Sequence, residues 1–311
     1  MTQTDNRLRV IQSQQDLSHN FVEERLAGFL ESRYVRKCDD YFVCYLSSHT
    51  GCNRGCAFCH LTATGQTSFT HSTTADFRAQ AERVFAHYRA EVAEGRQPSA
   101  RYVHFSFMAR GEPLANSTLV HDGAALLTML GNYAAEHSLP AKFCVSTIMP
   151  QTFLSASRSL ADCFGWVSPT IYYSLYSVDE GFRRKWMPTA MPVADALRIL
   201  ADYQRFSKKI VKIHYALIEG ENDGEADVDA VCSAIAAAGL LCEFNLVRYN
   251  PASDKQGRES PEETRAARLE QIRRSFAGKV AVIPRVGFDA KASCGMFVGG
   301  GAEAGFQLSS E

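Results

Sequence analysis

Three cysteines lie close together in the segment Cys52-Asn-Arg-Gly-Cys56-Ala-Phe-Cys59. Cysteine thiolates are the usual ligands of iron–sulfur clusters. At this spacing, three thiolates can reach three irons of a cubane and leave the fourth iron open. Phe58, just before the last cysteine, can shield such a cluster. The segment therefore predicts a [4Fe–4S] cluster held by Cys52, Cys56 and Cys59.

Two other interpretations of this segment are open. A zinc ion could use the same three cysteines with His60 as its fourth ligand. Structural zinc sites usually pair two separated cysteine knuckles, and the sequence has no second knuckle. The three cysteines could also be buried free thiols, but packing alone rarely places three of them at this spacing in a glycine-containing loop.

Composition narrows the class of protein. The chain has 311 residues, ten cysteines and a formal net charge of −1. We expect a cytoplasmic protein, because the sequence shows no secretory signal and no apolar run long enough to span a membrane. In that compartment the cysteines indicate metal binding, catalysis or burial rather than disulfides. The near-neutral charge gives no global sign of a nucleic-acid partner.

Strand-like and helix-like segments alternate through most of the chain. We expect strands near residues 42–48, 102–108, 142–147, 170–177, 209–218 and 241–249, with one more short strand possible at 280–284. We expect helices near 74–94, 119–136, 153–163, 193–206, 226–238 and 261–276. Six strand–helix units in a row predict parallel strands joined by right-handed crossovers. The fold class is therefore α/β, a partial (βα)6 barrel rather than a full eight-unit barrel.

The barrel is expected to cover residues 41–298 and to end in a C-terminal extension. Residues 1–40 are expected to form a short helical lead-in, and residues 299–311 a flexible tail. Chemistry in such barrels occurs at the C-terminal ends of the strands. The loops 49–60, 109–116 and 249–258 all follow strands, so we expect them to meet at that end.

Beyond the cysteines, several motifs occur in a recognisable order. Ser47 to Cys52 reads S-S-H-T-G-C, Gly111 to Asn116 reads G-E-P-L-A-N, and Ala292 to Gly295 reads A-S-C-G. Further matches are Val145-Ser146-Thr147, Tyr173-Ser174-Leu175, Asn245-Leu246 and Asn250-Pro251. Together with the cysteine loop, they resemble the radical S-adenosylmethionine superfamily, and within it the RNA adenine methyl synthases of the RlmN/Cfr type.

The resemblance implies cofactors and cofactor ligands. The open iron would bind the amino and carboxylate groups of S-adenosylmethionine, which one electron then cleaves to a 5′-deoxyadenosyl radical. Glu112, next to Gly111, would accept the ammonium of this molecule. Ser146, Ser174 and Asn250 would hold its ribose and carboxylate.

The resemblance also implies a role for Cys294. In these enzymes the matching cysteine is methylated by one S-adenosylmethionine. The radical from a second one removes hydrogen from this methyl group, and the carbon radical adds to carbon 2 or carbon 8 of an adenine. This chain would therefore be an RNA methyltransferase with Cys294 as its methyl carrier.

The sequence departs from the family at several positions. The family releases its covalent intermediate with a second cysteine, but Tyr45 stands at that position and Cys44 lies one residue earlier. A one-residue shift turns a strand side chain to the other face unless a bulge restores it. We nevertheless expect Cys44 to act as the second catalytic thiol. Tyr176 replaces a histidine, and Ala109-Arg110 replaces Gly-Met.

Another departure concerns the partners. About forty residues precede the first barrel strand, too few for the N-terminal accessory domain with which the family grips RNA, so we expect that domain to be lacking. The leading hypothesis is a monomeric RNA adenine methyltransferase that receives electrons from a reductant such as flavodoxin or ferredoxin. The alternatives are a radical S-adenosylmethionine enzyme that modifies a peptide or small molecule, and a non-catalytic zinc-binding module.

Overall fold

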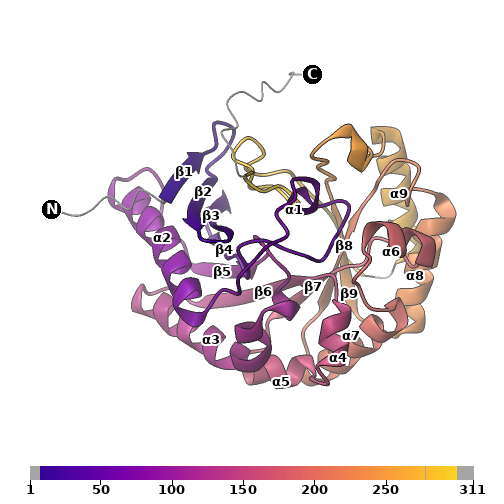
Figure 1. Ribbon diagram of the computed structural model, residues 1–311, viewed down its shortest axis with the longest axis horizontal. Coiled ribbons are helices and arrows are strands. Elements are labelled where there is room, and N and C mark those ends of the chain that lie inside the picture. Colours follow the sequence, from indigo (N-terminus) through magenta and orange to yellow (C-terminus); the bar gives the residue numbers. More distant parts are fainter. Residues whose placement is uncertain (1–7, 277, 300–311) are drawn as a thin grey trace.

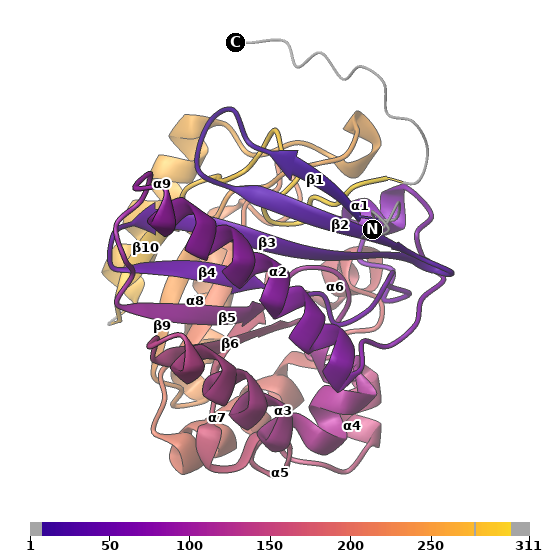
Figure 2. The same ribbon diagram turned by 90° about the vertical axis from the view of Figure 1, so that its left-hand side faces the viewer.

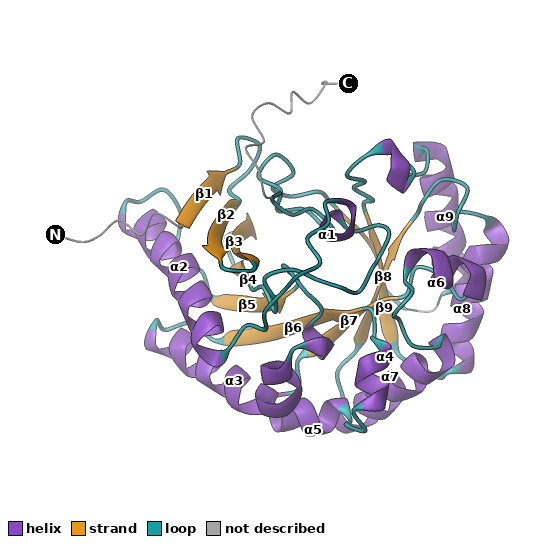
Figure 3. Ribbon diagram, viewed as in Figure 1, coloured by secondary structure: helices purple, strands orange, loops and turns teal. Residues whose placement is uncertain are grey.

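Seven parallel strands form the main part of the protein in the computed structural model, which describes residues 8–276 and 278–299. They are β4 (Tyr41–Tyr45), β5 (Tyr102–Phe107), β6 (Ala141–Thr147), β7 (Thr170–Ser174), β8 (Val211–Ala216), β9 (Cys242–Val247) and β10 (Val280–Ile283). The strands curve around an open interior, and the helices lie outside them (Figures 1 and 3). The predicted partial barrel is confirmed, with β10 as its last strand.

Helices connect successive parallel strands. The long ones are α2 (Thr74–Ala93), α3 (Ser117–Glu136), α7 (Val193–Ser207), α8 (Glu225–Ala237) and α9 (Glu262–Ser275). The short ones are α1 (His60–Ala63), α4 (Gln151–Ser155), α5 (Leu160–Phe164) and α6 (Glu180–Trp186). The sequence predicted every long helix to within a few residues but not α1 or α6. Thr73 and Asp76 form a reciprocal capping box that begins α2. None of the helices in the described part of the chain is long and apolar enough to cross a membrane.

The prediction of a helical lead-in is wrong for its described residues. Residues 8–38 form three antiparallel strands, β1 (Leu8–Gln12), β2 (His19–Arg25) and β3 (Gly28–Cys38). Strand β3 pairs with β4, so the sheet has ten strands in sequence order (Figure 2). Gly28 ends the tight turn between β2 and β3 with a φ of +87°, a value that favours glycine. The predicted flexible tail lies outside the described residues apart from Gly299.

Side chains alternate between the two faces of the parallel strands. Phe42 and Cys44 of β4, and Phe105 of β5, pack with the helices in the main hydrophobic core. Tyr45 and Ser106, their neighbours in sequence, face the interior of the barrel. This period of two follows from the pleat of a strand.

The segment 284–298 lies beside β1–β3 at the open side of the barrel (Figure 1, yellow). Asp289 accepts hydrogen bonds from the Ser13 hydroxyl (2.7 Å) and the Gln14 amide (2.6 Å). The Asn20 side chain donates to the Ala290 carbonyl at 3.2 Å. The N-terminal strands therefore hold the segment that carries Cys294.

Candidate cofactor and active site

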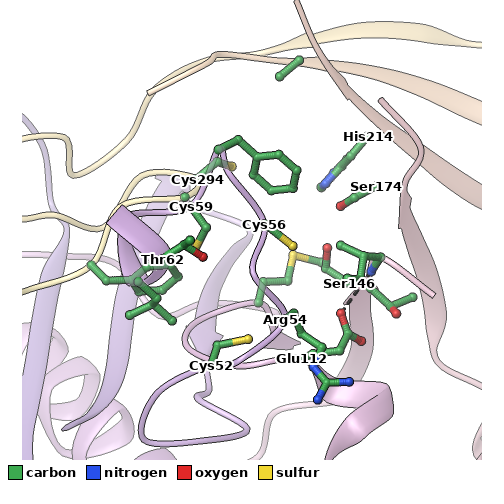
Figure 4. Close-up of a pocket in the computed structure, with 18 of the residues that line it drawn as sticks. Cys52, Arg54, Cys56, Cys59, Thr62, Glu112, Ser146, Ser174, His214 and Cys294 are labelled. Atoms are coloured by element: carbon green, nitrogen blue, oxygen red, sulfur yellow. Dashed lines mark hydrogen bonds between the residues drawn. The ribbon is translucent and has the colours of Figure 1, made fainter. Parts of the chain in front are cut away.

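A cavity lies at the C-terminal ends of the parallel strands and brings together nearly all the residues that the sequence singled out (Figure 4). Its lining includes Cys52, Cys56, Cys59, Gly111, Glu112, Ser146, Ser174, Asn250 and Cys294. They lie at the ends of β6 and β7, in the loops that follow β4, β5 and β9, or in the C-terminal segment, as expected for a barrel of this type. Cys44 is the one predicted site residue that does not line it. We call this space the cofactor cavity.

The cysteine loop is fixed by hydrogen bonds to its backbone. The Cys52 amide donates to the Gln66 carbonyl (3.0 Å), and the Ala57 amide donates to the Trp186 carbonyl (2.9 Å). The Gln256 side chain donates to the Ala57 carbonyl at 2.6 Å. Loops that follow β4, β7 and β9 thus hold the cysteines in place without using their sulfur atoms.

Burial controls the protonation of the three thiols. It raises the pKa of Cys52 to about 12, and it also raises the pKa of Cys56 and Cys59. A buried thiolate needs nearby positive charge, which bound iron would supply. The positive charges of Arg54 and Arg110 also favour the thiolate, because they oppose the rise in the pKa of Cys52 and Cys59, respectively. This donor set suits a metal cluster better than free thiols.

The zinc alternative fits the geometry less well. The described residues contain no group of three cysteine, histidine or acidic side chains placed to bind a single metal ion. Thiolates that each bind a different iron of a cluster need not converge on one point. The Nε2 atom of His60, the fourth ligand proposed for zinc, lies 3.0 Å from the Asn250 carbonyl oxygen. The three cysteines therefore fit a cluster better than a zinc ion.

Glu112 is buried at the edge of the cofactor cavity. Its two carboxylate oxygens accept hydrogen bonds from the Leu114 and Ile148 amides, both at 3.0 Å. Burial raises its pKa, while these hydrogen bonds oppose the shift. Glycine at position 111 lets this loop pack closely against Ser48, because a Cβ atom there would lie 2.6 Å from the Ser48 hydroxyl. The backbone φ of +93° at this position also favours glycine. The carboxylate is thus fixed in place and suited to accept an ammonium group.

Ser146 and Ser174 lie at the ends of β6 and β7 and line the cavity half-buried. Their predicted contacts to ribose and carboxylate stay a prediction. The side chain of Asn250 already has protein partners. It donates to the Cys294 carbonyl at 3.0 Å and accepts from Arg285 at 2.6 Å. Asn250 therefore holds the Cys294 segment, a role that the sequence did not suggest.

Cys294 lies where the C-terminal segment crosses the cavity. The His60 amide donates to the Gly295 carbonyl at 3.0 Å, and Arg33 donates to the Met296 carbonyl at 2.7 Å. Cys294 is an exposed residue, yet burial of its sulfur by the surrounding protein raises the pKa of the thiol, and Lys37 and Arg33 oppose this rise. An accessible thiol beside the cluster cysteines is placed to react with a molecule in the cavity.

The structure contradicts the role predicted for Cys44. Its side chain is fully buried in the core between sheet and helices, and burial alone raises its pKa. The interior position belongs to Tyr45, whose pKa burial raises most, with a further contribution from Cys294. No bulge occurs at this position, because Tyr34 pairs with Cys44 and Arg33 with Tyr45 in regular register. Cys44 therefore faces away from Cys294.

A buried charge network was not anticipated from the sequence. Glu31 and Arg33 of β3 form an ion pair at 2.8 Å, and Arg110 lies 3.6 Å from the same carboxylate. The Val298 amide also donates to Glu31 at 3.0 Å. The network ties the C-terminal segment to the loop before Glu112. The only signal was a pair of charges on one face of a strand, which the prediction of a helix obscured.

The comparisons agree with this geometry. The profile of the Radical SAM superfamily matches residues 46–230. The chain is 34% identical over 253 residues to a probable dual-specificity RNA methyltransferase RlmN of Frankia alni, covering 79% of this chain and 56% of that protein. A protein of the same name from Corynebacterium glutamicum is 29% identical over 298 residues, which cover 93% of this chain and 75% of its own length. The chain spans just over half the length of the Frankia relative.

A solved structure supports the fold. The radical SAM methyltransferase from Sphaerobacter thermophilus superimposes with a TM-score of 0.74 at 22% identity, covering 93% of this chain and 81% of that one. The matched profile covers more than half of the chain and includes the cysteine loop and Glu112. The chain belongs to the radical SAM superfamily.

Proposed function

We propose that this protein is an RNA adenine methyltransferase that uses Cys294 as an intermediate methyl carrier. The observation that carries the proposal is the position of Cys294, which lines the same cavity as the three cluster cysteines and Glu112. The RlmN-type relatives support it through the identity they share with most of this chain. Because the chain spans only part of the Frankia relatives, their activity is carried over as a proposal.

The cavity residues suit a two-stage reaction. In the first stage the Cys294 thiolate attacks the methyl carbon of S-adenosylmethionine. A sulfur–carbon bond forms on Cys294, the sulfonium–methyl bond breaks, and S-adenosylhomocysteine leaves with the electron pair. Burial raises the pKa of the Cys294 thiol, and the positive charges of Lys37 and Arg33 oppose this rise and so favour the thiolate.

The second stage requires radical chemistry. Enzymes of this superfamily use a [4Fe–4S] cluster and S-adenosylmethionine, and the cluster supplies the electron that yields the 5′-deoxyadenosyl radical. Glu112 would orient this second molecule by accepting its ammonium group. The aromatic carbons of adenine are electron-poor and do not attack a sulfonium methyl group directly. A methyl group carried on Cys294 would instead become a carbon radical, which can add to such an aromatic carbon.

The proposed partners follow from this reaction. The substrate is RNA, and the cluster receives electrons from a reductant such as flavodoxin or ferredoxin. We further propose a monomer that acts in the cytoplasm.

A second candidate function rests on the strand that precedes the cluster loop. Tyr45 occupies the position of the family's resolving cysteine, and Cys44 faces the core. A chain without this thiol suits a radical enzyme of another reaction class, one that modifies a peptide or a small molecule without a covalent RNA adduct.

An RNA assay separates the two candidates. The anaerobically reconstituted protein is incubated with ribosomal and transfer RNA, dithionite and methyl-labelled S-adenosylmethionine. After nuclease digestion we expect label in 2-methyladenosine or 8-methyladenosine, and no label with the Cys294→Ala variant. Formation of 5′-deoxyadenosine without label in RNA would favour the second candidate.

A further inference from the structure

A second cavity fills the interior of the barrel beyond Cys294. We call it the inner chamber and define it by the side chains of β4, β5, β8 and β9 that point away from the helices, including Tyr45, Ser106, His214 and Asn245. Its volume of about 320 Å³ lies in the range of about 300–1,000 Å³ that small-molecule sites occupy. An interior of this size lined by polar groups is hydrated rather than packed.

The inner chamber is strongly cationic. Six lysine and arginine side chains line it, with Glu243 as the single carboxylate. Four of the six cations have ion-pair partners: Arg33 pairs with Glu31, Lys212 with Glu243, and both Arg248 and Arg285 with Glu259. The site therefore has positive charge left over for an anionic ligand.

The two remaining cations are Lys37 and Lys279. Neither side chain has an ion pair or hydrogen bond within the part of the chain that the structure describes. Lys37 lies near the end of β3 and Lys279 just before β10, so both belong to the end of the barrel where the parallel strands begin. Cys294 and Asp16 act on Lys37 through space, and the Asp16 carboxylate already accepts a hydrogen bond from the Gly287 amide at 2.7 Å.

Asn245 adds a neutral recognition group. The residue is only 5% exposed, its carboxamide has no hydrogen-bond partner among the described residues, and its polar atoms keep access to the inner chamber. A carboxamide that faces a hydrated cavity can exchange its water for a ligand group that pairs with it. A carboxamide presents a donor and an acceptor side by side, which matches the edge of adenine. Near it, the rings of Tyr172 and His214 pack edge to face at 4.9 Å and provide an aromatic surface.

The two cavities meet at Cys294. Cys294, His214 and Asn250 line both of them. Figure 4 shows Cys294 and His214 at one end of the cofactor cavity, with Cys52 and Glu112 at the other. A ligand in the inner chamber would therefore approach the thiol from the side opposite the cofactor.

We propose that the inner chamber binds an adenine nucleotide, with its base paired to Asn245 and its phosphate between Lys37 and Lys279. This inference rests on the proposed function, because it places the methyl acceptor next to Cys294. The shared chemistry is a phosphorylated adenosine, which is either a free nucleotide or one nucleotide of an RNA strand.

The binding test uses adenosine monophosphate with the anaerobically reconstituted full chain, measured by calorimetry. Saturating S-adenosylhomocysteine keeps adenosine-containing probes out of the cofactor cavity. We expect adenosine monophosphate to bind about tenfold more tightly than adenosine, since a charged phosphate gains the two lysines. Equal affinity for the two probes would overturn the assignment of the lysines.

Four variants locate the nucleotide. Lys37→Met and Lys279→Met should each weaken adenosine monophosphate about tenfold and leave adenosine unchanged. Asn245→Asp, which keeps the side-chain shape, should weaken both probes. Lys209→Met, which removes an exposed lysine that does not line the chamber, is the matched control and should change neither. If Glu112→Gln lowers the affinity while Asn245→Asp does not, the nucleotide lies in the cofactor cavity and the inference fails.

A chemical readout reports the chamber independently of affinity. Adenosine monophosphate should slow the alkylation of Cys294 by iodoacetamide, whereas the exposed Cys38 should react at an unchanged rate. Unchanged alkylation of Cys294 at saturating nucleotide would contradict the shared boundary.

Further arms separate the two nucleotide sources and the two proposals. A single-stranded RNA that competes with adenosine monophosphate would identify a nucleotide in a strand, and a lack of competition would identify a free nucleotide. Methylation of Cys294 without nucleotide binding would remove the chamber site and keep the proposed function. Nucleotide binding without methylation of Cys294 would keep the chamber site and remove the proposed function.

Discussion

Cys44 and Tyr45 are neighbours in β4 whose side chains lie on opposite faces of the sheet. Cys44 packs among the helix-facing core residues, and Tyr45 lines the inner chamber with Cys294. The thiol next to the expected resolving position in the sequence is thus separated from the reaction site by the backbone of its own strand. If the protein forms a covalent adduct through Cys294, release depends on a group other than Cys44.

The two faces of β4 can be tested by alkylation of the folded protein. We expect Cys44 to be unreactive, because it has no exposed surface. The Tyr45→Cys variant should gain one reactive thiol, because this position borders the inner chamber. Peptide mass mapping assigns the modified residues. Alkylation of Cys44 under native conditions would show that it does not face the core.

Removing the Cys44 thiol should affect stability rather than turnover. Cys44→Ala should lower the free energy of unfolding by about 1–2 kcal/mol, as for loss of a small buried side chain. Denaturant unfolding measures this cost. Accumulation of protein crosslinked to RNA in this variant would restore Cys44 to the mechanism.

The cluster assignment predicts a specific loss of iron. Alanine in place of Cys52, Cys56 or Cys59 should each abolish the iron and sulfide content of the reconstituted protein. Cys38→Ala is the matched control, because Cys38 is exposed and lies outside the cofactor cavity. A full complement of iron in all three ligand variants would exclude the assignment.

Protonation of Glu112 should make the binding of S-adenosylmethionine depend on pH. Burial raises the pKa of this carboxyl group, so its negative charge is lost as pH falls through that raised value. The affinity for S-adenosylmethionine should decline over the same interval. Glu112→Gln should weaken binding by roughly 1–3 kcal/mol at neutral pH and remove this part of the pH dependence. An unchanged pH profile in the variant would mean that another group titrates.

We expect Asn250 to restrain the backbone of the segment that carries Cys294. Asn250→Ala removes the hydrogen bonds to the Cys294 carbonyl and from Arg285. Amide hydrogen exchange at residues 293–296 should become faster, with a loss of about 1–3 kcal/mol in stability. Asn132→Ala, at an exposed position of α3, is the control. Weaker cofactor binding without faster exchange would instead assign Asn250 to the cofactor, as the sequence predicted.

Much of the barrel could be predicted because its signals are local. The helices α2 and α7 have apolar residues at helical spacing, and strands such as 102–107 are short apolar runs between them. The N-terminal strands could not be recognised in this way. Glu31 and Arg33 lie buried in β3, where they satisfy each other through an ion pair at 2.8 Å. Buried charges that pair with each other within one strand hide the alternation of apolar and polar residues that identifies a strand.

The residues of the candidate site also divide into those that local spacing predicts and those that depend on the fold. Cys52, Cys56 and Cys59 share one loop, so their spacing alone predicted a common cavity. Whether Cys44 or Tyr45 faces Cys294 depends on the register of β4 against β3, which the sequence does not specify. We also did not predict that polar residues of the strands line the inner chamber. Asn245 was noted only as part of a motif, although its place between Phe244 and Leu246 puts it on the interior face.

The most direct test of the account is the chemical state of Cys294. Protein incubated with S-adenosylmethionine is digested, and the peptide that contains Cys294 is examined by mass spectrometry. We expect a single methyl group on the Cys294 sulfur, formed without reductant because the first stage is a polar displacement. Cys38, the other exposed thiol, should stay unmodified and serves as the internal control. An unmodified Cys294 in protein that still yields 5′-deoxyadenosine with dithionite would contradict the role of Cys294 as a methyl carrier.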